Sequence, residues 1–130
     1  MNNVQTKYRF LFVGGGTGGH LFPAIAVAEQ IREMKPDAEI LFIGTKDKIE
    51  GKVVPGLGFK FKSIWIKGFA RKITLENLLF PLKLVVATIQ SLLINISFKP
   101  RVALGSGGYV AGPAIWAASV MGSKIILLEQ

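Results

Sequence analysis

Short apolar runs alternate with longer segments of helical periodicity along the chain. Apolar runs of strand length bounded by turn residues are typical of buried strands, and apolar positions at helical spacing are typical of amphipathic helices. The pattern predicts strands at residues 8–13, 39–43, 60–66, 101–104 and 124–128. It predicts helices from the first glycine loop to about Lys35, in a short segment ending near Pro55-Gly56, over 75–97 and over 113–121.

Strands that alternate with helices indicate βαβ units. We therefore expect an α/β fold, with a Rossmann-like parallel sheet that carries helices on both faces. The length of 130 residues suits a single domain. In sheets of this kind, ligands bind beyond the carboxyl ends of the strands, and two glycine loops, at 14–19 and 105–112, fall at that edge.

Composition narrows the chemistry. The chain has no cysteine, which excludes disulfides, thiolate catalysis and cysteine-based zinc sites. One histidine, eight acidic residues and the lack of an Asp-x-Asp pair leave little material for a metal site, so we expect neither a metal nor a cofactor. The formal net charge of +8 attracts polyanions, which include nucleic acids, phosphorylated substrates and anionic bilayers.

The first glycine loop reads Gly14-Gly15-Gly16-Thr17-Gly18-Gly19-His20. A strand that turns into a helix through glycines directs backbone N–H groups and the positive end of the helix dipole at one place, which makes an anion site. A Walker A loop would carry Lys and then Ser or Thr after its last glycine, where this chain has His20 and Leu21. Nucleotide hydrolysis of the P-loop kind is therefore not expected.

Two other templates remain for this loop. The dinucleotide motif G-x-G-x-x-G is present as Gly14, Gly16 and Gly19, but Gly44-Thr45-Lys46 stands where that motif needs an acid after the second strand. The second template is a loop that binds the diphosphate of a sugar nucleotide or a polyprenyl carrier. Of the templates compared, it requires the fewest residues that this chain lacks.

The second loop, residues 105–112, lies at the same edge and leads into a helix with Pro113 in its first turn. By itself it is equally consistent with a tight strand–helix turn. Because two such loops flank one crevice, we expect a phosphate-rich ligand between them.

His20 is the only histidine and follows the first loop directly. Imidazole is suited to accept a proton near neutral pH, and a helix N-terminus disfavours its charged form, which fits a general base for an attacking hydroxyl. A capping or packed histidine is the alternative. Without a metal, backbone N–H groups and helix dipoles would stabilise a departing diphosphate.

These motifs together resemble a known family. The segment 15–28 (GGTGGHLFPAIAVA), Gly44-Thr45 with Glu50 and Pro55, Gly68-Phe69 with Arg71-Lys72, and Lys99-Pro100 are similar to the MurG family of bacterial N-acetylglucosaminyltransferases. The similarity continues through Gly107-Gly108-Tyr109-Val110, Gly112-Pro113 and Glu129-Gln130, in order along nearly the whole chain. It departs from the family at Leu128, where the family often has histidine, which puts a catalytic role for that position in doubt.

The resemblance implies an inverting GT-B transferase that moves GlcNAc from UDP-GlcNAc to the C4 hydroxyl of the MurNAc unit of lipid I, forming lipid II. Residues 1–130 would be its N-terminal acceptor and membrane domain, and the donor-nucleotide domain would lie outside this chain. His20 matches the proposed base, and Thr17, Gly18 and Gly19 match positions that contact the donor. The acceptor diphosphate is expected at Gly15, Gly16, Ser106, Gly107, Gly108 and Tyr109.

The long helix raises the question of a membrane. Its apolar run from Leu84 is short for a span of about 20 residues, and we interpret it as a helix packed on the sheet. Its start, with Leu79 and Phe80 and a basic rim that includes Lys72 and Lys83, is expected to contact an anionic bilayer. The implied location is the cytoplasmic face of the bacterial inner membrane, as a peripheral protein.

Two alternatives remain open from the sequence. A binding subunit of a split GT-B transferase and an NAD-binding Rossmann domain would both present the same glycine loops.

Residues 59–72 interleave aromatic and basic side chains, as single-stranded nucleic-acid sites do. Because no RNP, KH or helix-turn-helix signature accompanies them, we expect no nucleic-acid partner, and most of these aromatics are expected to face the core.

Overall fold

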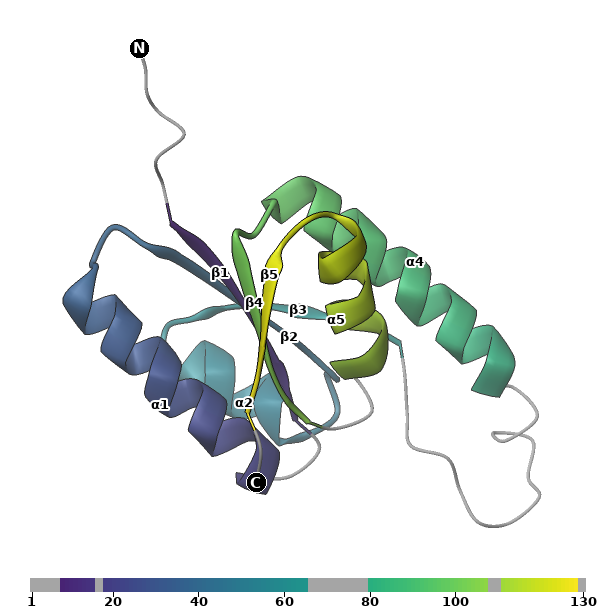
Figure 1. Ribbon diagram of the computed structural model, residues 1–130. Helices are drawn as coiled ribbons and strands as arrows, with labels where there is room; N and C mark the ends of the chain where they lie inside the picture. Colours follow the sequence, from purple (N-terminus) through teal and green to yellow (C-terminus); the bar gives the residue numbers. More distant parts are fainter. Residues whose placement is uncertain (1–7, 16–17, 66–79, 108–110, 129–130) are drawn as a thin grey trace.

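The computed structural model describes residues 8–15, 18–65, 80–107 and 111–128 of the chain. Strands and helices alternate through these segments, as the hydrophobic pattern predicts (Figure 1). The elements are β1 (Arg9–Gly14), α1 (Gly18–Met34), β2 (Glu39–Gly44), α2 (Ile49–Gly56), β3 (Lys60–Ser63), α4 (Phe80–Phe98), β4 (Val102–Gly107), α5 (Ala111–Val120) and β5 (Lys124–Leu127).

The described strands form one parallel sheet in the order β3-β2-β1-β4-β5. The central strand β1 pairs with β2 on one side, Leu11 opposite Leu41, and with β4 on the other, Leu11 opposite Ala103. The chain first builds outward from β1 to β3 and then crosses back through α4 to β4. The order therefore reverses between β1 and β4.

Helices cover both faces of the sheet, which confirms the expected α/β architecture. Because side chains alternate along a strand, Leu11 and Val13 point to one face and Phe12 to the other. The first face packs against α4 and α5, and the second packs against α1 and α2 (Figure 1). On the second face the rings of Phe12 and Phe42 stack with centroids 5.1 Å apart.

Several predicted boundaries were wrong. Strand β3 ends at Ser63, before the predicted end at 66, and Trp65 is exposed. Strand β4 continues through Gly105 and Ser106 to Gly107, so the first part of the predicted loop at 105–112 is a buried, paired strand. The end of α4 was placed well, since Lys99 adopts a φ of 54° directly after Phe98, in the left-handed region that ends helices.

Helix α4 lies on the sheet with one face and leaves the other exposed. Ala87 is fully buried in the core, and Ile94 and Phe98 pack beside it. The opposite face exposes a row of apolar side chains at helical spacing, namely Leu82, Val85, Ile89, Leu93 and Ile96. Its segment Pro81–Phe98 passes the length and composition test for a membrane-crossing helix, although 22% of that segment is buried in the fold.

Candidate anion and catalytic site

The reversal of strand order places the ends of β1 and β4, from which the two glycine loops leave, side by side. Strand β1 ends at Gly14 and its neighbour β4 ends at Gly107, and these two residues are opposite each other in the sheet. Helix α1 begins at Gly18 and α5 at Ala111, so two helices start just beyond this edge. Crevices at such a reversal are where open α/β sheets bind ligands, and helix N-termini there favour anions.

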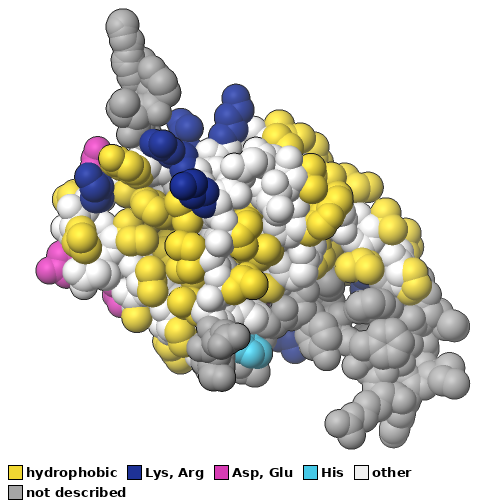
Figure 2. Space-filling model, viewed as in Figure 1, with side chains coloured by type: hydrophobic (Ala, Val, Ile, Leu, Met, Phe, Trp, Pro, Cys, Tyr) yellow, Lys and Arg dark blue, Asp and Glu magenta, His cyan; other side chains and the backbone are white. Residues whose placement is uncertain are grey.

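His20 lies in the first turn of α1 and its ring rests against the end of β4. A Cβ atom added to Gly107 would lie 2.7 Å from Cδ2 and 3.0 Å from Nε2 of His20. Gly107 also has a φ of +116°, which side-chain-bearing residues rarely adopt. The histidine ring remains partly exposed and reaches the surface at the lower edge of the view in Figure 2. The structure thus brings the predicted base and the second loop into contact.

Ser106 fastens β4 to the start of α1. Its hydroxyl donates a hydrogen bond to the carbonyl oxygen of His20, and the side chain is only 1% exposed. A Cβ on Gly14 would lie 1.9 Å from the Ser106 Oγ, so the hydroxyl occupies the space that a side chain at Gly14 would need. The Ser106 side chain therefore faces the protein interior, which differs from its expected contact with the acceptor diphosphate.

Glu50 packs against the first glycine loop, a structural role that was not predicted from the sequence. Its carboxylate accepts a hydrogen bond of 2.8 Å from the backbone N–H of Thr45, and the residue is 1% exposed. A Cβ on Gly15 would lie within 2.5 Å of both carboxylate oxygens, and one on Gly44 would lie 2.4 Å from the Glu50 Cγ. The sequence feature that could have indicated this contact is an acidic residue in the first turn of the short helix after β2.

Other predicted site residues lie outside the described residues. They are Gly16 and Thr17 of the first loop, Gly108 and Tyr109 of the second, and Lys72 and Leu79 before α4. For Phe80 the structure gives the backbone alone. Gly18 and Gly19 form the first turn of α1, where their N–H groups have no partner within the helix.

Lys83 does not lie on an exposed basic rim, so that expectation was wrong. The residue is 5% exposed, and its ammonium nitrogen lies 5.6 Å from the centroid of the Trp65 ring. Of the aromatics in residues 59–65, Phe59 and Phe61 pack in the core as expected, whereas Trp65 is 43% exposed. Within the described residues, no group of three or more His, Asp or Glu side chains is arranged to hold a metal ion.

Comparison with known families agrees with this arrangement. Residues 10–130 match the model of the glycosyltransferase family 28 N-terminal domain. Proteins named UDP-N-acetylglucosamine–N-acetylmuramyl-(pentapeptide) pyrophosphoryl-undecaprenol N-acetylglucosamine transferase are similar over nearly the whole chain. That of Cytophaga hutchinsonii is 42% identical over 97% of the chain, that of Flavobacterium psychrophilum 44% over 95%, and that of Clostridioides difficile 46% over 94%.

A solved structure supports the same assignment of fold. The crystal structure of Acinetobacter baumannii MurG superimposes with a TM-score of 0.73 at 26% identity and covers 92% of this chain. The predicted resemblance is therefore confirmed. The chain spans about a third of the length of these relatives: 34%, 34% and 30% of the three sequences and 33% of the crystallised chain.

Proposed function

We propose that this chain, which belongs to the glycosyltransferase family 28 N-terminal domain family, forms the acceptor-binding part of an N-acetylglucosaminyltransferase. The acceptor is a polyprenyl-linked diphosphate of an N-acetylmuramoyl pentapeptide, lipid I, and the product is lipid II. The donor is UDP-GlcNAc, held mainly by a second domain outside these residues. The names of the relatives carry the same substrates.

One observation carries this proposal: His20 lies between the ends of β1 and β4, at the reversal of strand order, with two helix N-termini beside it. A diphosphate at this edge would accept hydrogen bonds from backbone N–H groups and be stabilised by the helix dipoles. The His20 ring stands at the same edge, held against Gly107. The C4 hydroxyl of the acceptor sugar lies across one pyranose ring from the diphosphate at C1, so a diphosphate bound at this edge would leave that hydroxyl within reach of the imidazole.

The chemistry assigned to His20 is general-base catalysis. The imidazole would accept the proton of the C4 hydroxyl while that oxygen attacks C1 of GlcNAc, and UDP would leave from the opposite side with inversion at C1. The Ser106 hydrogen bond holds the backbone of His20, and the ring packs against Gly107, an arrangement that would preorganise the base before the substrate arrives.

The test is transfer of labelled GlcNAc from UDP-GlcNAc to a soluble lipid I analogue. It would be run on the chain alone and on the chain fused to the remaining C-terminal part of the Flavobacterium psychrophilum relative. We expect transfer by the fusion and none by the chain alone. Replacement His20→Ala in the fusion should reduce turnover by about 100-fold or more, the scale of a lost general base. Unchanged turnover would remove His20 from the mechanism.

For the membrane we propose contact through the outer face of α4. The apolar row from Leu82 to Ile96 is exposed, and the exposed lysines Lys60, Lys62 and Lys99 lie beside its C-terminal half. Hydrophobic side chains also follow the side of the molecule where Figure 1 places α4 (Figure 2). An apolar face with a basic margin suits the anionic cytoplasmic leaflet.

Sedimentation with vesicles that contain phosphatidylglycerol tests this contact. Ile89 on α4 is 52% exposed and Ile126 on β5 is 47% exposed, so the two isoleucines form a matched pair. We expect Ile89→Glu to release the protein from the vesicles and Ile126→Glu to leave binding nearly unchanged. Equal effects of the two substitutions would contradict a membrane face on α4.

A further inference from the structure

A cavity of about 310 Å³ opens at the carboxyl edge of the sheet. Neither His20 nor any residue of the first glycine loop that the structure describes lines it. It lies beyond the ends of β2 and β3, and Gln90 of α4 also lines it. Its volume is at the lower end of the range of about 300–1,000 Å³ found for small-ligand sites. Its polar and aromatic lining residues are Thr45, Lys46, Asp47, Ser63, Trp65 and Gln90.

The lining combines one aromatic surface with fixed polar groups. The side-chain oxygen of Gln90 accepts a hydrogen bond of 2.7 Å from the backbone N–H of Trp65, which leaves the amide N–H₂ group to donate. The buried Lys83 ammonium lies over one face of the Trp65 ring, and the ring is 43% exposed. One face of the Trp65 ring is therefore held by a cation–π contact, and the exposed part of the ring is available to pack against a ligand.

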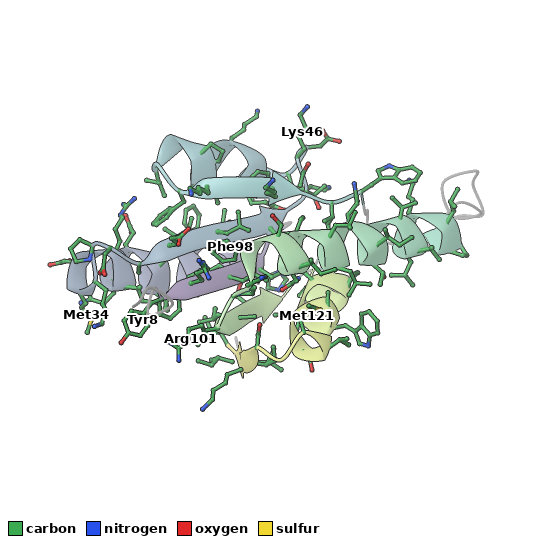
Figure 3. All side chains as sticks on the ribbon, turned by 90° about the horizontal axis from the view of Figure 1, so that it is seen from above. Tyr8, Met34, Lys46, Phe98, Arg101 and Met121 are labelled. Carbon is green, nitrogen blue, oxygen red and sulfur yellow. The ribbon has the colours of Figure 1, made fainter. Side chains whose placement is uncertain are left out.

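Charges of both signs stand at the mouth of this cavity. Lys46 and Asp47 follow β2 in sequence and are both exposed. Lys46 projects outward at the edge of the molecule, beyond the sheet (Figure 3). A ligand that carries both a carboxylate and an ammonium group would pair with both side chains. Simple sugars and phosphates offer no such combination, whereas a peptide does.

Glu50 connects this cavity to the anion site. Its carboxylate contacts the position of Gly15 in the glycine loop and holds the N–H of Thr45, which lines the cavity. Glu50 thus links the glycine loop to the wall of the cavity. A ligand with a diphosphate in the loop and a peptide attached to the same sugar would reach both.

We propose that the cavity between Thr45 and Gln90 is the subsite for the peptide part of the acceptor. This inference rests on the proposed function, since it needs an acceptor whose sugar carries both a diphosphate and a peptide. Lys46 pairs with a peptide carboxylate, Asp47 with an ammonium group, and Trp65 covers an apolar side chain. The subsite would let the protein distinguish the peptide-bearing acceptor from a bare sugar diphosphate.

Calorimetric titration of the chain with two synthetic ligands tests the inference. One ligand is the diphosphate of N-acetylmuramoyl pentapeptide and the other is the same diphosphate without the peptide. We expect the wild-type chain to bind the first at least about tenfold more tightly, and Lys46→Ala to remove most of that preference. Lys48→Ala is the control, because Lys48 is an exposed lysine two residues away that does not line the cavity.

The possible outcomes separate the two proposals. Equal affinity of the wild-type chain for both ligands would overturn the peptide subsite and leave the diphosphate site standing. Equal losses from Lys46→Ala and Lys48→Ala would also overturn it, because the effect would then be one of net charge. Binding of neither ligand would overturn the proposed function and the subsite together. A preference lost in Lys46→Ala alone would support the subsite.

Discussion

The substitution Gly107→Ala tests the contact between the two loops most directly. The added methyl group would lie 2.7 Å from the His20 Cδ2 and 3.2 Å from its Cγ, closer than carbon atoms approach without movement. Those atoms belong to a side-chain ring, which is able to turn away. The fold should therefore survive, with the His20 ring displaced from the end of β4.

Two terms contribute to the expected loss of stability. A φ of +116° costs an alanine about 1–3 kcal/mol, and a ring turned off its preferred rotamer costs about 0.5–1.5 kcal/mol. Gly122 isolates the first term, since it has a φ of +92° and nothing within 4 Å of an added Cβ. Gly112 is the control for both terms, because an added Cβ meets open space there, no positive φ is involved and the residue lies in the first turn of α5, so little change in stability is expected.

Urea unfolding and turnover by the fusion protein provide the assays. We expect the order of stability to be Gly112→Ala, then Gly122→Ala, then Gly107→Ala. Only Gly107→Ala should reduce turnover, by about 100-fold for a displacement near 1 Å. The double variant with His20→Ala should recover the steric part of the loss but not the backbone part. If Gly107→Ala resembles Gly122→Ala in both stability and turnover, the ring does not rest against Gly107 as described.

Two further predictions concern the supports of the loops, both measured by urea unfolding. Ser106→Ala removes the donor to the His20 carbonyl in the first turn of α1 and should lower the free energy of unfolding by about 1–3 kcal/mol, whereas a loss under 0.5 kcal/mol would contradict that link. Glu50→Ala removes the acceptor for the Thr45 N–H and leaves a cavity, so a loss of about 2–4 kcal/mol is expected. Glu50→Gln keeps an acceptor of the same shape and should lose less than half as much; equal losses would show that the Thr45 hydrogen bond contributes little.

The fold was predictable because its signals are local. The central strands β1 and β2 are short apolar runs, and the stop at Lys99-Pro100 is a local feature that the φ of Lys99 confirms. The boundary at β4 was not predictable in this way. Gly105 and Gly107 resemble loop residues in the sequence, yet Gly105 pairs with both β1 and β5, and Gly107 pairs with β1.

The site was predictable in position but not in its internal contacts. The glycine loops and His20 share one edge because parallel strands end together, and the sequence carries that information. That Ser106 binds the His20 carbonyl depends on residues 86 positions apart. The burial of Lys83 under Trp65 likewise depends on how α4 crosses the sheet, which charge and hydropathy along the chain do not encode.

The central place of β1 also bears on how the chain folds during synthesis. The β1 residue Phe10 pairs with Ile40, which is translated 30 residues later. Its partner on the other side, Val102, is translated 92 residues later. Until then one edge of β1, and the part of the apolar face that α5 later covers, stay exposed. Such late, non-local pairing slows folding and exposes strand edges to aggregation. Nascent chains that stop before β4 should therefore depend on chaperones, and those that extend past β5 should not.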